Sequence, residues 1–155
     1  MAGLRCTITK IITTFAASKN YLVAKCVPPS NHRVRLESIV ATALIKPSAT
    51  TPTSVRIDFG TWATGALDAA TGVKINDSDN ETPLAVWTTK DAIEGTLSDT
   101  RITGAVSAAN PQCVLTIPPG RDDYMKGGAS YGILVTTGTD ATGIESLKIV
   151  ATYEE

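Results

Sequence analysis

Aromatic residues, charged residues and histidine are all scarce in this sequence. Aromatic side chains make up 5% of the 155 residues and charged side chains 19%, and there is 1 histidine. The 14 basic and 15 acidic residues give a net charge of −1 and form no run of either sign. Such a distribution neither attracts nucleic acid nor holds a chain at an anionic membrane. We therefore expect no nucleic-acid partner and no membrane partner.

Cysteine is also rare, and its pattern excludes two uses. Cys6, Cys26 and Cys113 are odd in number and widely spaced, with no C-x-x-C pair and no histidine cluster beside them. This disfavours both a disulfide framework and a zinc site, so we expect three small buried apolar side chains. A chain of this length buries about 70% of its unfolded surface. That burial suffices for a single domain over residues 1–155 without disulfides.

Long hydrophobic runs are missing as well. The apolar N-terminal stretch, Leu4 to Ala17, is interrupted by Arg5 and Lys10 and otherwise filled with threonine. It predicts neither a membrane-spanning helix nor a signal peptide. We expect a protein that is made in a cytoplasm and stays soluble.

The histidine and the carboxylates form no recognisable catalytic set. His32 lies in a Pro/Ser/Asn turn near Ser30, but no Gly-x-Ser-x-Gly segment is present to expose a nucleophilic serine. A sandwich glycosidase needs two carboxylates about 5 to 10 Å apart, among aromatic residues that stack on sugars. Asp58, Glu37 and Glu145 are candidates, but the chain is poor in aromatic residues. We predict that the protein is not an enzyme and needs no cofactor.

One acidic segment offers a weak candidate for a metal site. Asp77, Asp79 and Glu81 place three oxygen donors at alternate positions. The EF-hand pattern requires glycine at loop position six and glutamate at position twelve, where this chain has Thr82 and Thr88. A solvated loop is the simpler interpretation, and an irregular calcium site stays open as the alternative.

What the sequence does contain is a regular alternation of apolar and polar residues. After residue 112, apolar and β-branched residues alternate with polar ones in three runs, which are separated by turn formers such as Pro118-Pro119-Gly120 and Gly127-Gly128. A period of two predicts half-buried β-strands. The three predicted strands are 113–117, 131–137 and 145–153.

Similar patterns predict further strands earlier in the chain. Ile11-Ile12 interrupts the alternation of the first strand, which indicates a bulge or bend there. A Thr-capped helical turn is also predicted over 89–94. The earlier strands are predicted at 4–9, 21–25, 33–46, 53–59, 84–87 and 101–107.

The longest strand candidate, 33–46, has a competing interpretation. Its apolar residues also fit a helical period, but Pro47 and the neighbouring strands favour β-structure. If the strand is regular, Val34, Leu36, Val40 and Leu44 share one face. The opposite face then has Glu37, Ile39, Ala41 and Ala43.

Seven to nine strands predict an all-β fold. We expect a single antiparallel β-sandwich, jelly-roll-like, with a long loop-rich connection between residues 60 and 111. Long connections of this kind are usually functional or variable surface. The solvent-facing strand positions are rich in threonine, whose β-branch suits a sheet without adding charge. Examples are Thr7, Thr9, Thr42, Thr136 and Thr152.

Two sets of residues are candidates for binding. The loop from Pro118 to Gly128 contains Arg121 and Tyr124, which are residue types enriched at protein interfaces, although a plain turn explains the loop equally well. Trp62 and Trp87, together with Tyr124 and Tyr131, could supply a stacking platform for sugars. The alternative is that both tryptophans belong to the core.

The closing pattern resembles the head decoration, or cement, proteins of tailed bacteriophages, which are small jelly-roll virion proteins. The residues that match are Val114 to Gly120, Gly127-Gly128, Ile133 to Gly138, Thr142-Gly143 and Leu147 to Tyr153. The match covers about the last forty residues and consists of strands and turns without an invariant functional motif.

The resemblance implies a virion structural protein on the capsid exterior. Such a protein self-associates, as a homotrimer, and binds the major capsid protein of a phage head, bridging neighbouring capsid subunits without doing chemistry. Two alternatives stay open. One is a non-catalytic carbohydrate- or receptor-binding β-sandwich module, and the other is a small jelly-roll coat subunit.

Overall fold

The computed structural model describes residues 4–49, 53–64, 68–70, 73–75, 83, 85–89, 95–117 and 124–155. For residues 62–64, 68–70, 73, 74, 86–89 and 124 the description is limited to the backbone. Within these residues the chain forms strands and one short 3-10 turn, η1 (Ala141–Gly143). The predicted helical turn at 89–94 lies mostly outside the described residues.

The strands agree closely with the predicted ones. The predicted strand 84–87 begins two residues later than expected, as β7, and the predicted strand 53–59 continues to Thr64, as β4. The strands are β1 (Arg5–Ile12), β2 (Asn20–Val27), β3 (Arg33–Ile45), β4 (Ser54–Thr64), β5 (Asp68–Ala70), β6 (Val73–Lys74), β7 (Val86–Thr89), β8 (Thr96–Leu97), β9 (Ile102–Ser107), β10 (Gln112–Thr116), β11 (Tyr124–Lys126), β12 (Tyr131–Thr137) and β13 (Ile144–Glu154).

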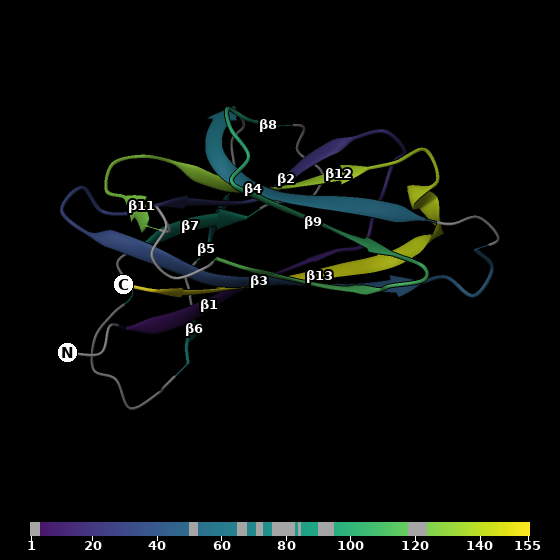
Figure 1. Ribbon diagram of the computed structural model, residues 1–155, viewed down its shortest axis with the longest axis horizontal. Helices are drawn as coiled ribbons and strands as arrows, with labels where there is room; N and C mark the ends of the chain where they lie inside the picture. Colours follow the sequence, from purple (N-terminus) through teal and green to yellow (C-terminus); the bar gives the residue numbers. More distant parts are fainter. Residues whose placement is uncertain are drawn as a thin grey trace.

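The strands form two antiparallel sheets that face each other (Figure 1). Sheet A has the order β10-β3-β13-β1-β6, with β11 also paired to β3. Sheet B has the order β5-β7-β2-β12-β4-β8, with β9 also paired to β4. The predicted all-β sandwich is therefore confirmed.

The strand order within the sandwich is that of a jelly roll. Its eight main strands give the orders β1-β13-β3-β10 in one sheet and β2-β12-β4-β9 in the other, which is the arrangement of two interleaved Greek keys. The short strands β5 to β8 all belong to the long connection between β4 and β9. The last two main strands, β12 and β13, lie inside the sheets, each between two strands from the first half of the chain.

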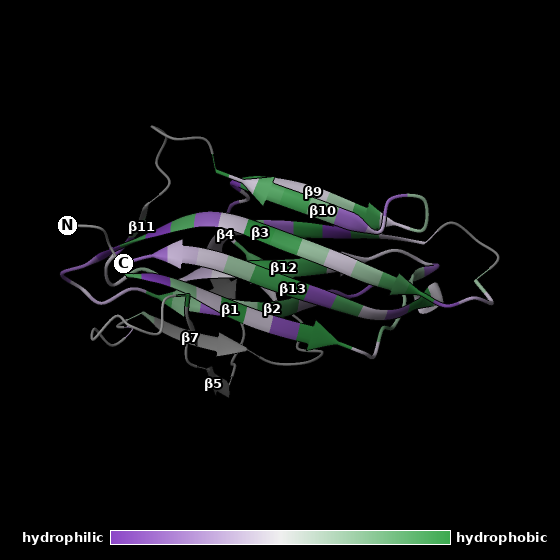
Figure 2. Cartoon of the chain, turned by 90° about the horizontal axis from the view of Figure 1, so that it is seen from below, coloured by the Kyte–Doolittle hydropathy of each residue, from purple (hydrophilic) through white to green (hydrophobic). Residues whose placement is uncertain are grey.

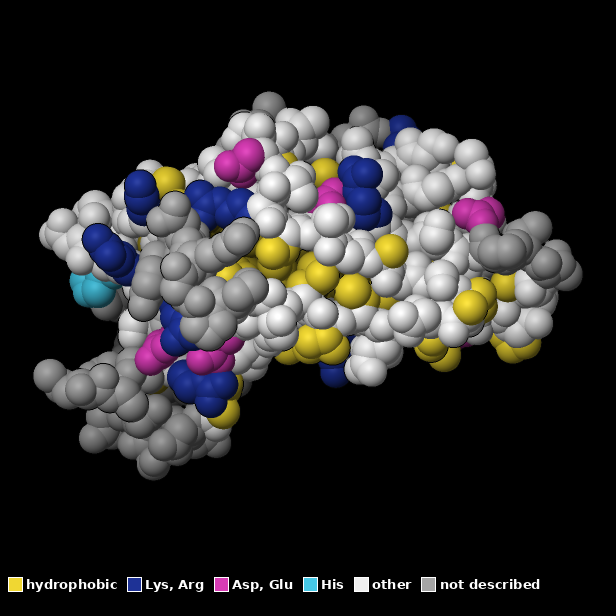
Figure 3. Space-filling view, viewed as in Figure 1, with side chains coloured by type: hydrophobic (Ala, Val, Ile, Leu, Met, Phe, Trp, Pro, Cys, Tyr) yellow, Lys and Arg dark blue, Asp and Glu magenta, His cyan; other side chains and the backbone are white. Residues whose placement is uncertain are grey.

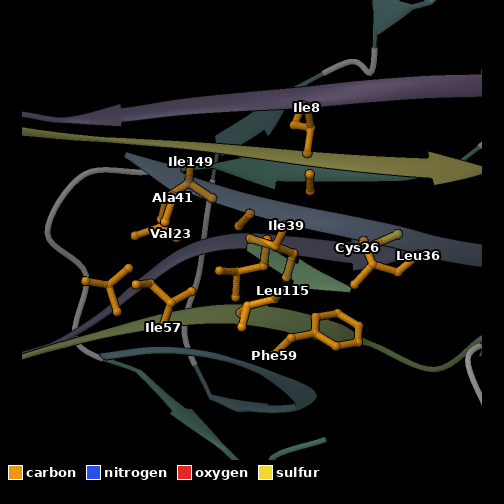
Figure 4. Packing of buried hydrophobic residues seen from close by; sticks show 14 of the residues in the cluster. Ile8, Val23, Cys26, Leu36, Ile39, Ala41, Ile57, Phe59, Leu115 and Ile149 are labelled. Atoms are coloured by element: carbon orange, nitrogen blue, oxygen red, sulfur yellow. The ribbon is translucent and has the colours of Figure 1, made fainter. Parts of the chain in front are cut away.

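The core fills the space between the inner faces of the two sheets. Ile39 and Ile149 of sheet A meet Ile57 and Phe59 of sheet B in this layer (Figure 4). Such close packing of apolar side chains is the main favourable term in folding.

The cysteines mostly behave as predicted. All three are free thiols; Cys6 and Cys26 are buried, and Cys113 is half-buried. Burial raises the pKa of the Cys26 thiol, so this side chain stays neutral and acts as a small apolar residue.

The predicted bulge at Ile11-Ile12 is wrong. Strand β1 pairs with β13 in one unbroken register, from Arg5 opposite Glu154 to Ile12 opposite Leu147. Ile11 faces outward and Ile12 is buried, so the regular pleat explains two adjacent isoleucines without an extra residue. The ladder continues past the strand ends, where Leu4 and Glu155 exchange two backbone hydrogen bonds.

The long strand β3 contains the irregularity instead, and the helical alternative for this segment is wrong. Ser38 lies opposite Thr152, whereas Leu36 lies opposite Tyr153, so Glu37 is an extra residue in β3. One extra residue exchanges the two faces of a strand. Beyond Glu37, the core side is therefore occupied by Ile39, Ala41 and Ala43.

The predicted face of β3 is consequently wrong after Leu36. Val34 and Leu36 are buried as expected, but Val40 is only half-buried and Leu44 is exposed. A strict period of two could not reveal this change, because both faces of β3 have aliphatic residues.

This assignment of faces predicts unequal effects of two similar truncations. Ile39→Ala should lower the free energy of unfolding by about 2–5 kcal/mol because it leaves a cavity in the core. Leu44→Ala should change it by no more than about 0.5 kcal/mol because Leu44 faces solvent. Urea unfolding of both variants measures the difference. Equal losses would contradict the bulge at Glu37.

Candidate interaction surface

The outward side of sheet A is an open surface with few charges, which we call the outer face. It is formed by the outward residues of β10, β3, β13 and β1. Figure 2 shows these four strands side by side. The strand registers align these residues in rows that run across the sheet. The rows are Thr116-Ser38-Thr152-Thr7, Val114-Val40-Val150-Thr9 and Gln112-Thr42-Lys148-Ile11.

Large apolar side chains are exposed on this outer face. Val114 is 56% exposed, Leu44 is 54% exposed and Ile11 is 52% exposed. Lys148 is the one charged residue in the three rows. Contiguous apolar surface that is bordered by polar residues is typical of interaction sites.

Charges gather at one end of the outer face and neutralise each other there. The Arg5 guanidinium donates hydrogen bonds to Glu37, with the shorter Nη2 to Oε2 distance at 2.6 Å. The hydrogen bond from Arg5 to Glu37, and then the Glu37 charge, raise the pKa of Arg5. Arg35 forms a second, longer ion pair with Glu154, at 3.7 Å between Nη1 and Oε2. The bulge places Glu37 where it can meet Arg5.

The outward side of sheet B differs, because its centre is shielded from solvent. Leu22 and Leu134 are buried although both lie on the outward side, opposite each other in neighbouring strands. Asp58 is buried beside them, and its Oδ2 accepts a hydrogen bond of 2.8 Å from Nε of Arg56. Among the described parts of the molecule, the open sheet face is therefore that of sheet A.

Strands β9 and β10 close one side of the sandwich, and we call this side the β9–β10 edge. Gly104 of β9 lies directly against β10, since a Cβ at this position would come within 2.4 Å of Leu115 Cδ2 and 2.6 Å of Cys113 Sγ. Figure 3 views the molecule from this side and shows hydrophobic side chains along its middle, with the charged ones mainly near the two ends and the top.

The turn before β9 is anchored on β4. The backbone amides of Ser98 and Arg101 each donate a 2.8 Å hydrogen bond to carbonyls of β4, those of Thr61 and Phe59 respectively. The Thr61 amide in turn donates to Asp99 Oδ1 at 2.6 Å, and this bond lowers the pKa of the Asp99 carboxyl. The ionised carboxylate therefore stabilises the start of β9.

The structure places the backbones of the residues predicted for a sugar platform, and of their side chains it describes that of Tyr131. Trp87 lies opposite Cys26 in a row that continues through Tyr131 to Thr61, one residue before Trp62. Two strands separate the backbones of the two tryptophans, a spacing of roughly 14 Å. Their side chains lie outside the described residues, as does that of Tyr124.

Tyr131 is a core residue and not part of an exposed platform. Its side chain is buried, and its ring stacks on Phe59 with 6.2 Å between centroids. Its hydroxyl accepts a hydrogen bond of 2.9 Å from the Lys126 amide, and the Arg101 guanidinium lies 5.0 Å from the ring centroid.

The predicted metal and loop candidates cannot be placed. Asp77, Asp79, Glu81 and Arg121 lie outside the described residues. Within the parts of the chain that are described, no group of three or more His, Cys, Asp or Glu side chains could hold a metal ion.

Two of the three carboxylate candidates lie on different sheets, and the third, Glu145, is exposed at the start of β13. Glu37 lies on the outer face of sheet A, where it pairs with Arg5, whereas Asp58 lies on the outward side of sheet B. The carboxylates of Glu37 and Asp58 are therefore on opposite sides of the sandwich. His32 is exposed in its turn, where its amide donates to the Pro29 carbonyl.

No helix within the described residues is long and apolar enough to cross a membrane.

The β9–β10 edge was missed by the sequence analysis, although the sequence contains a signal for it. No acidic or basic residue occurs from Ile102 to Ile117. This segment includes both edge strands, and its lack of charge becomes informative only when the strand order is known.

No family model and no curated protein sequence matches this chain. Two similar solved structures are of viruses. The empty head of turnip yellow mosaic virus aligns at 12% identity over 99% of this chain and 80% of that chain, with a TM-score of 0.33. Desmodium yellow mottle tymovirus aligns at 13% identity over 98% of this chain and 86% of that chain, with a TM-score of 0.30. Scores this low establish no shared function, and the jelly-roll assignment rests on the strand order.

The lowered pKa of Asp99 predicts a pH-dependent contribution to stability. The ionised form is favoured in the folded state, so its contribution is present above the unfolded pKa of about 3.9. It is lost as the pH falls through the folded pKa. Asp99→Asn should therefore be less stable than the wild type at pH 7 and should lose less stability between pH 5 and pH 2. Urea unfolding across this range measures both slopes, and identical slopes would contradict the prediction.

Proposed function

We propose that this protein is a structural component of a virus particle, a decoration or cement protein that binds the outside of an assembled phage head. It bridges capsid subunits by burying surface and does no chemistry. The observation that supports this function best is the outer face of sheet A, which is open, nearly uncharged and studded with exposed aliphatic side chains on a jelly roll.

The jelly roll narrows the alternatives without deciding among them. The fold occurs in capsid proteins, lectins and cupins, and a fold alone does not determine function. Metal sites in such folds are commonly built from several histidine ligands. This chain has 1 histidine. A lectin surface relies on aromatic stacking, whereas aromatic residues here are few and Tyr131 is buried. A structural subunit requires neither feature.

The chemistry of the outer face fits attachment by area burial. Apolar atoms removed from water contribute roughly 25 cal/mol per Å², and threonine can be buried at modest cost when its hydroxyl finds a partner. A nearly neutral face also avoids the desolvation of unpaired charges.

Self-association would strengthen such an attachment. If three copies join, a trimer engages three capsid sites at once, and linked sites can gain ~100-fold or more in avidity when the geometry permits. The trimer is the stoichiometry that the resemblance to cement proteins implies. Light scattering of the purified protein should accordingly give three times 16.2 kDa.

Binding to particles tests the function. Purified heads of the parent virus that lack this protein should take it up saturably in a sedimentation assay. Ile11→Lys should weaken uptake by at least about 10-fold, equivalent to ~1.4 kcal/mol, because it places a charge in the apolar surface that becomes buried. Thr139→Lys, at an exposed residue in the turn after β12 and outside the three rows of the outer face, is the control and should bind like the wild type.

Three results would contradict this proposal. Absence of saturable uptake by the heads would refute the decoration role. Closed shells formed by the purified protein alone, seen by electron microscopy, would indicate a coat subunit instead. Saturable binding in a glycan screen that is lost in Trp62→Ala or Trp87→Ala would indicate the carbohydrate-binding alternative.

A further inference from the structure

The two strands at the β9–β10 edge each have one open side. Among the described residues, β9 pairs with β4 and β10 pairs with β3, and neither strand has a second partner. Each strand therefore presents a row of backbone N–H and C=O groups that can extend its sheet. Strand β9 runs from Ile102 to Ser107 and β10 from Gln112 to Thr116.

The usual protections of an exposed edge are missing here. Proteins guard edges with charged residues, prolines, bulges or very short strands. Neither β9 nor β10 contains a charged residue or a proline, and the register of each with its neighbour is regular. On the opposite side of sheet A, β6 pairs only with Cys6 and Thr7 among the described residues, so β1 is open from Ile8 to Ile12, and this stretch contains Lys10. The β9–β10 edge thus combines two open strands without a charged residue.

The outward side chains at this edge are suited to burial. Thr103 and Ala105 of β9 are exposed, as are Gln112, Val114 and Thr116 of β10. Val114 ends the row that runs through Val40 and Val150, so the apolar surface continues to the very border of sheet A. Gly104 keeps β9 close to β10, and the two edges therefore form one surface.

We propose that the β9–β10 edge is the surface through which a second copy of this chain docks, by pairing of edge strands. This inference deepens the proposed function and rests on the self-association proposed there, because it names the contact that joins copies. The outer face is the surface proposed to meet the capsid, and the β9–β10 edge, which borders it at Val114, is the surface proposed to join one copy to the next.

The edge of an identical chain is complementary to the β9–β10 edge. A strand edge offers alternating donors and acceptors, so an edge of the same kind satisfies it, and identical chains associate through symmetric contacts. Like charges facing each other are the common obstacle to self-pairing, and no charge occurs between Ile102 and Ile117. Beyond this segment the edge is bounded by β11, which contains the exposed Lys126.

The size of the edge sets the expected strength of the contact. Strands of this length extend about 17–20 Å and the sheets lie about 10 Å apart, so the surface covers on the order of several hundred Å² per copy. Stable interfaces bury about 800 Å² per partner. We therefore expect association that depends on protein concentration in the micromolar range.

The experiment compares two variants in which lysine replaces an exposed aliphatic residue, once at the β9–β10 edge and once away from it. Val114→Lys introduces a charge at the β9–β10 edge, and Ile11→Lys introduces one at a similarly exposed aliphatic residue three strands away in sheet A. Light scattering at several concentrations, without any particles, should show an oligomer for the wild type and for Ile11→Lys. Val114→Lys should weaken association at least ~10-fold, because the contact would bury a charge without a partner.

Hydrogen exchange gives a second measurement, which reports on the edge strands directly and does not depend on the mass of the oligomer. Amides of residues 102–117 should exchange more slowly when the concentration of wild-type protein is raised through the association range, because newly paired edges are protected. The same increase should leave exchange in Val114→Lys unchanged. Thermal unfolding of each variant at low concentration shows whether the monomer remains folded.

Each outcome decides the matter. A wild-type protein that is monomeric at all concentrations, or a folded Val114→Lys that associates like the wild type, overturns the docking edge. A dimer or a trimer that is lost in Val114→Lys supports it. If a monomeric wild-type protein binds particles, the decoration role is supported and the docking edge is refuted. If the protein self-associates but does not bind particles, the docking edge is supported and the decoration role is refuted.

Discussion

The pairing of β13 with β3 determines most of what is distinctive about this molecule. The two strands run along each other from Ile144 opposite Ile45 to Glu154 opposite Arg35, and the register shifts at Glu145 of β13 and at Glu37 of β3. The shift at Glu37 is the one that matters for the faces of β3. That residue exchanges the faces of β3, so Ile39, Ala41 and Ala43 enter the core. It also places Val40 and Leu44 outside and brings Glu37 to Arg5. The apolar character of the outer face is thus a direct result of one bulge.

The outward sides of the two sheets differ in exposure as a result. Sheet B shields its outward leucines and a paired aspartate, whereas sheet A leaves valine, isoleucine and leucine side chains in water. Burying exposed aliphatic groups against another surface would be favourable. An unguarded strand edge adjoins the same apolar rows, so both unsatisfied features lie on neighbouring surfaces.

Alternation predicted the strands and the sandwich well, because half-buried strands are dictated by local sequence. The same rule failed at two points within strands. Ile11-Ile12 suggested a bulge that a regular pleat accommodates, while the true bulge at Glu37 left no trace in a strand with aliphatic residues on both faces. The candidate interaction surface was harder to predict from the sequence than the strands. Trp62, Trp87, Arg121 and Tyr124 attracted attention by residue type, but an edge strand is defined by its missing neighbour, and that depends on long-range pairing.

The position of the last two strands affects how the chain folds during its synthesis. β12 lies between β2 and β4, and β13 lies between β1 and β3, so neither sheet can close while these strands are still inside the ribosome. Until then, four early strands expose open edges on a chain with few charges, and such intermediates aggregate readily. During synthesis, the early strands therefore wait for the C-terminal strands before either sheet can form completely. Expression yield should thus be limited by completion of the C-terminal third, not by the stability of the finished sandwich.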